Sequence, residues 1–87
     1  MSYLKFPLGN QRRGTLVRVN LQGVESDVFL VDSANLTSFE RGSDFHYTGG
    51  HYKSSPIQLV TPSAGEWTTV VVPTGGRVRA SVSVVHS

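Results

Sequence analysis

The end of the chain constrains its fold more than any other segment. Residues 77–84 alternate without a break, with arginine or serine at every other position and valine or alanine between them. A period of two over such a length is typical of an antiparallel strand with one face in a core and the other in water. The rest of the chain must therefore supply an apolar layer that covers this face.

Three further segments follow strand patterns. Residues 15–21 alternate with valine and leucine on one side, whereas residues 27–32 contain an apolar run on both faces and are expected to form a central strand. Residues 66–72 form another strand, and their tryptophan, Trp67, is expected in the core because a small domain needs large buried aromatic side chains. The short segment 22–26 suits a hairpin connection between the first two strands.

Residues 33–42 are the one stretch without a strand pattern. Asp32 or Ser33 is suited to cap a helical turn, Leu36 and Phe39 fall on one side of that turn, and Gly42 is a natural C-terminal stop. The segment allows a helix of two turns at most.

The near-palindrome HYTGGHY predicts a hairpin with Gly49-Gly50 as its two-residue loop and residues 44–48 and 51–60 as its arms. In this register Tyr47 faces Tyr52 across the hairpin. Phe45 shares a face with both tyrosines, while the opposite face carries Asp44, His46, His51 and Lys53.

The polar face of this expected hairpin contains the donor types of many metal sites, namely Asp44, His46 and His51. Lys53 lies directly opposite His46 and would repel a cation, so a solvated polar face is the favoured interpretation. A metal-dependent enzyme using these three residues stays a distant alternative. Because no Gly-x-Ser-x-Gly elbow or recognisable pair of catalytic acids is present, we expect no catalytic residue and no cofactor.

Composition excludes several functional classes. Eight lysines and arginines against six acids leave a net charge of +2, and the basic residues are scattered, which argues against nucleic-acid binding. The chain has no cysteine, so disulfides and thiolate metal sites are excluded. No apolar run approaches the ~20 residues of a membrane-spanning helix, and the N-terminus lacks the charge order of a secretory signal. We expect a cytoplasmic protein without a membrane partner.

These patterns define a fold class. A chain of 87 residues is expected to form a single domain over residues 1–87. About six strands, most of them joined by short turns, predict an all-β fold. The expected architecture is a small antiparallel β-sandwich or partly open barrel with at most one short helical turn.

The order of several short motifs resembles one bacterial family, known as domain of unknown function eighteen-eighty-three. The motifs are Asp32-x-x-Asn35, Arg41-Gly42, Tyr47-x-Gly49-Gly50, Ser55-Pro56, Pro62-x-x-Gly65-x-Trp67 and Gly76-Arg77-Val78. This resemblance implies a compact β-sandwich that occurs alone or joined to TIR-like signalling modules, with no assigned activity. The chain departs from the family pattern at Asp27 and Pro73, where members tend to carry asparagine and aspartate.

The fusion to signalling modules favours sensing or binding over catalysis by analogy. We therefore expect a non-enzymatic module that binds a small ligand or a protein partner, and the resemblance suggests a link to signalling or defence. Its site is expected in the loops, at Asn35, Tyr47, Gly49, Gly50 and Ser55. The alternative is a structural protein that forms homo-oligomers through exposed strand edges.

Overall fold

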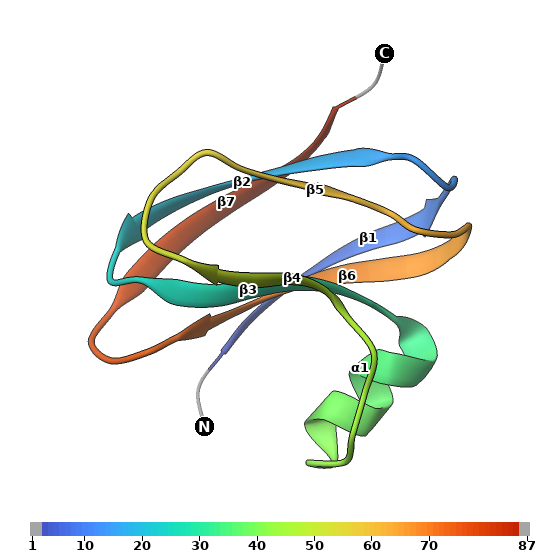
Figure 1. The fold of residues 1–87 in the computed structure, drawn as a ribbon, viewed down its shortest axis with the longest axis horizontal. Coiled ribbons are helices and arrows are strands. Elements are labelled where there is room, and N and C mark those ends of the chain that lie inside the picture. The colour runs from blue at the N-terminus through green and yellow to red at the C-terminus, as the bar shows by residue number, and fades with distance from the viewer. Residues whose placement is uncertain (1–2, 86–87) are drawn as a thin grey trace.

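The computed structural model describes residues 3–85, which form seven strands and one helix (Figure 1). All paired strands are antiparallel and belong to two sheets, with strand orders β1-β6-β3-β4 and β5-β2-β7. The elements in chain order are β1 (Leu4–Gln11), β2 (Leu16–Gly23), β3 (Ser26–Asp32), α1 (Ser33–Glu40), β4 (Thr48–Tyr52), β5 (Ile57–Val60), β6 (Gly65–Pro73) and β7 (Val78–Val85).

The two sheets stack face to face, and α1 lies on the far side of the four-stranded sheet (Figure 1). Valines of β2, Val17 and Val19, meet Val28 and Leu30 of β3 between the sheets, and all four are fully buried. The sheets are not closed into a barrel. The structure therefore confirms the expected antiparallel β-sandwich.

Strand β3 is central, as its doubly apolar sequence predicts. It pairs with β6 on one side and β4 on the other. Because successive side chains point to opposite faces, Val28 and Leu30 enter the core between the sheets, while Phe29 and Val31 pack on the outer face. On this outer face, Leu36 and Phe39 of α1 pack against the sheet together with Phe45.

Helix α1 confirms the helix expected between residues 33 and 42. The carboxylate of Asp32 accepts a hydrogen bond of 2.8 Å from the backbone N–H of Asn35, so of the two predicted candidates Asp32 is the N-cap. Gly42 follows the helix with a φ of +76°. The eight residues of α1 exceed a single turn.

No helix within residues 3–85 is long and apolar enough to cross a membrane.

Trp67 is buried in the core between the sheets, with 5% of its surface exposed. Its indole N–H donates to the backbone carbonyl of Ser63 at 2.9 Å, so the one polar atom of the ring is satisfied. The prediction that Trp67 is a core residue is confirmed.

One expectation about connectivity is wrong, and one strand was not expected. Strands β2 and β3 do not form a hairpin, because β2 belongs to the three-stranded sheet and β3 to the four-stranded sheet. Strand β1 was not predicted, since Pro7 and Gly9 interrupt its alternation; its register with β6 shifts between these two residues. A bulge of this kind is common on edge strands, and β1 is the seventh strand where about six were expected.

The predicted hairpin at HYTGGHY is also wrong. Both glycines lie inside β4, with Gly49 opposite Phe29 and Gly50 opposite Val28 of β3. Residues 44–47 form a loop rather than an arm, and residues 57–60 form β5 in the other sheet. Gly49 serves the close approach of β4 to β3 instead of a turn. An added Cβ at this position would lie only 2.8 Å from the Cβ of Phe29.

Candidate functional site

An open groove lies on the outer face of the four-stranded sheet, beside α1. Its volume is about 410 Å³, which falls in the range of small-ligand sites. Strands β3, β4 and β6, helix α1 and the loop 41–47 all contribute to it. We call it the aromatic groove, lined by Asp27, Phe29, Phe39, Phe45, Tyr47, Gly50, His51 and Val72.

Four of the eight residues that line the groove are phenylalanine or tyrosine. Phe29 is buried, and its ring centroid lies 5.4 Å from those of Phe39 and Tyr47 and 5.6 Å from that of Phe45. These distances are typical of stabilising ring pairs. Tyr47 packs on this cluster with 57% of its surface exposed. The groove therefore offers solvent an aromatic ring that its neighbours hold in place.

Asn35 positions the loop that carries Phe45 and Tyr47. Its side-chain oxygen accepts a hydrogen bond of 2.8 Å from the backbone N–H of His46, and its Nδ2 donates to Asp32 at 2.9 Å. The two bonds connect the loop to the first turn of α1. Asn35 thus acts through the loop and is not among the groove-lining residues.

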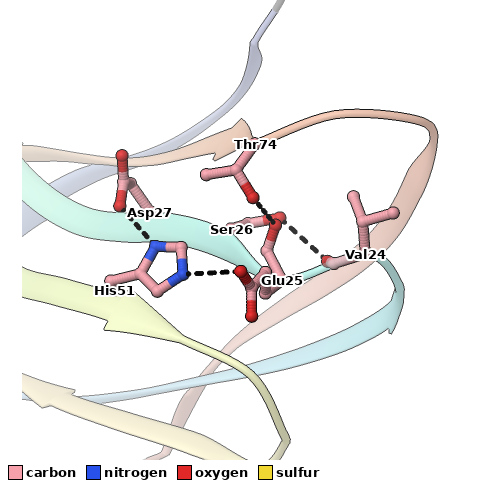
Figure 2. A network of polar contacts seen from close by, with 6 residues as sticks. All are labelled: Val24, Glu25, Ser26, Asp27, His51 and Thr74. Atoms are coloured by element: carbon pink, nitrogen blue, oxygen red, sulfur yellow. Dashed lines mark hydrogen bonds and ion pairs between the residues drawn. The ribbon is translucent and has the colours of Figure 1, made fainter.

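The polar end of the groove is a histidine between two carboxylates. His51 of β4 lies opposite Asp27 of β3, and its Nδ1 is 2.8 Å from the Oδ1 of Asp27. Its Nε2 is 3.4 Å from the Oε1 of Glu25, as Figure 2 shows. The hydroxyl of Thr74 donates to the backbone carbonyl of Glu25 at 2.8 Å and holds this residue beside the sheet.

These contacts change the protonation of His51. The hydrogen bond with Asp27 raises the pKa of His51 above its ordinary 6.5; partial desolvation opposes this rise, and Glu25 adds to it. A raised pKa in the folded state means that the protonated ring stabilises the fold. This contribution is complete below the ordinary pKa of 6.5 and is lost as the pH rises through the folded-state pKa.

The substitution Asp27→Asn is expected to lower the pKa of His51, because it removes the carboxylate whose hydrogen bond contributes most to the rise. An NMR titration of the His51 ring protons measures this pKa directly. Glu66→Gln is the matched control, since it removes one charge outside the groove. An unchanged pKa in Asp27→Asn would contradict the described contact.

The groove brings together only some of the residues that the sequence suggested. Tyr47 and Gly50 line it, whereas Gly49 provides clearance against β3. Ser55 is occupied elsewhere, because its hydroxyl accepts from the backbone N–H of Leu21 at 2.8 Å and donates to the carbonyl of the same residue at 2.9 Å. Asn35 and Gly49 thus support the fold around the groove, whereas Ser55 is bonded to β2 of the other sheet.

Sequence reasoning missed the phenylalanines and Asp27. Three of the four phenylalanines of the chain, Phe29, Phe39 and Phe45, line the groove together with Tyr47. Phe39, Phe45 and Tyr47 cluster within residues 39–47, and this clustering was the available signal. The contact between Asp27 and His51 has no signal in the sequence, because it depends on the pairing of β3 with β4.

The donor set of the metal alternative does not come together. His51 contacts Glu25 and Asp27 instead of Asp44 and His46. Within residues 3–85, no group of three or more histidine, aspartate or glutamate residues is placed to hold a metal ion. The proposed shared face depended on the hairpin, which the structure replaces with β4 and a loop.

The fold and the groove define a small β-sandwich protein with an aromatic groove on its outer face. The family model described as Domain of unknown function (DUF1883) matches residues 1–87. The chain belongs to this family, which is the one that its motifs resemble. No curated protein and no solved structure matches the chain significantly. Functional inference therefore depends on the groove.

Proposed function

We propose that the protein is a cytoplasmic, non-enzymatic binding module that holds a small ligand in the aromatic groove. The observation that carries this proposal is the exposed ring of Tyr47, packed on Phe29 and Phe45 at the edge of a 410 Å³ groove. A concave apolar surface with a few polar groups at one end is the usual form of a ligand site. Aromatic side chains of this kind contribute large contact area at low entropic cost.

The chemistry of the groove supports binding over catalysis. None of the side chains that line it is a serine, threonine, cysteine or lysine, so the lining has no aliphatic hydroxyl, thiol or amine nucleophile. Both ring nitrogens of His51 lie against carboxylates, at 2.8 and 3.4 Å. A general base needs a free nitrogen within reach of the substrate proton, and His51 has neither nitrogen free.

The substitution Tyr47→Ala is expected to weaken the binding of ligands in the groove by about tenfold, because it removes an aromatic contact area. A fragment screen by two-dimensional NMR identifies such ligands through shifts in the amide signals of Gly50 and His51. The matched control is Val60→Ala, which truncates an exposed apolar side chain on the other sheet.

Two results of this screen would contradict the proposal. One is a screen in which no fragment shifts the signals of Gly50 and His51. The other is a set of hits whose affinity falls equally in Tyr47→Ala and Val60→Ala, because the groove would then have no special role.

Assembly through a strand edge is a second candidate, favoured by β7. This eight-residue strand pairs with β2 alone among the described strands and forms one edge of its sheet. Long edge strands are templates for pairing with another chain. An assembled protein should show a melting temperature that rises with its own concentration, whereas a constant melting temperature and a monomeric mass would exclude this candidate.

A further inference from the structure

The polar end of the aromatic groove carries an excess of negative charge. Asp27 and Glu25 flank His51, and their side chains are 49% and 46% exposed. His51 supplies at most one positive charge, so the three side chains together hold at least one net negative charge. None of the eight lysines and arginines of the chain lines the groove.

The lysine on the same face of the sheet is occupied elsewhere. Lys5 of β1 lies 3.1 Å from a carboxylate oxygen of Glu40, the last residue of α1. The same oxygen accepts a hydrogen bond of 2.6 Å from the hydroxyl of Tyr3. Lys5 therefore compensates the charge of Glu40, and the charge of Asp27 is shared with His51 alone among the described contacts.

The carboxylates at the polar end of the groove act as hydrogen-bond acceptors. Asp27 contacts His51 through Oδ1, and no described residue donates a hydrogen bond to its Oδ2, which Figure 2 shows pointing away from the imidazole. A carboxylate accepts several hydrogen bonds, so Asp27 retains acceptor capacity. Both nitrogens of His51 already face carboxylates. The two carboxylates thus accept hydrogen bonds, and neither nitrogen of His51 is free to donate to an anion.

The aromatic rings also favour a positively charged ligand. Their faces carry negative electrostatic potential, and an organic cation within about 6 Å of a ring centroid is attracted to it. Tyr47 is exposed, and its centroid lies 5.4 Å from that of Phe45, which is partly exposed. Two adjacent rings and a carboxylate within one groove are complementary to a cation on an apolar skeleton.

We infer that the aromatic groove selects small organic cations, in which an ammonium or guanidinium group is attached to an aromatic or apolar skeleton. This inference rests on the proposed function, because it names the ligand class of the same groove. The cationic group meets Asp27 and the rings, and the skeleton occupies the apolar part near Phe29 and Val72.

Three ligands of similar shape and different charge test the inference. At pH 7, 2-phenylethylamine is a cation, 2-phenylethanol is neutral and 3-phenylpropanoate is an anion. Each is titrated into the full chain, and dissociation constants are obtained from the amide shifts of Gly50 and His51. We expect the cation to bind about fivefold tighter than the alcohol, or better, and the anion to bind weakest.

Variants assign the selectivity to Asp27. In Asp27→Asn, the ratio between the cation and the alcohol is expected to fall to within about twofold, as expected when the adjacent charge is lost. Glu66→Gln removes the same charge outside the groove and should keep the ratio. If Asp27→Asn does not fold, the comparison of three ligands in the unmodified chain still decides the matter.

Each remaining outcome has a distinct meaning. Equal or tighter binding of the alcohol or the anion would overturn cation selectivity while the proposed binding function stands. If none of the three ligands shifts the groove signals, the inference is wrong, and the fragment screen separately decides whether the groove binds anything.

Discussion

Replacing Gly49 with alanine is expected to lower the free energy of unfolding by about 3 kcal/mol or more, which places it among the severe single substitutions. Gly49 has a φ of +151°, a conformation that costs little only for glycine. An added Cβ would lie 2.2 Å from the carbonyl oxygen of Val28 and 2.6 Å from the Cα of Phe29. Both are backbone atoms of β3, so relief requires β4 to move away from β3.

Gly50→Ala is the matched control for this prediction. Gly50 does not have a positive φ, and a Cβ added there meets no heavy atom within 4 Å. We expect a change of less than about 1 kcal/mol, as is usual for an unstrained substitution. Urea unfolding followed by the fluorescence of the buried Trp67 measures both variants. Equal losses at the two positions would contradict the described pairing of β4 with β3.

Two buried threonines are expected to respond in opposite ways to the same substitution. The Thr61 hydroxyl donates to the carbonyl of Arg12 at 2.6 Å and accepts from the backbone N–H of Thr15 at 2.9 Å, with 1% of the residue exposed. Thr61→Val keeps the shape but removes both bonds. We expect a loss of about 1.5 kcal/mol, because two partly buried hydrogen bonds are removed together.

Thr69 is fully buried on the inner face of β6, and its hydroxyl has no protein hydrogen-bond partner among the described residues. Thr69→Val removes a polar group that is buried without a partner, so we expect a gain of about 1 kcal/mol. The two variants therefore differ by roughly 2.5 kcal/mol in the same urea experiment. A loss at Thr69 as large as that at Thr61 would show that the Thr69 hydroxyl is bonded.

The sequence by itself determined the elements whose signals are local. The alternation of residues 77–84 corresponds to β7, and the doubly apolar run within residues 27–32 corresponds to the central strand β3. The Asp32 cap and Gly42 bracket α1. Each of these signals lies within a few residues of the element that it predicts, because burial period and capping act over short distances. They were sufficient for the β-sandwich.

Only the tertiary structure decided which strands are neighbours and where the groove lies. A short turn after β2 is compatible with a hairpin or with a crossing between sheets, and a glycine pair is compatible with a turn or with close approach to a partner strand. The choice at Gly49 depends on Phe29, which is distant in the chain but directly opposite in the sheet. The aromatic groove likewise combines side chains of α1, the loop 41–47 and three strands. Its chemistry arises from contacts between distant segments, which local sequence patterns do not record.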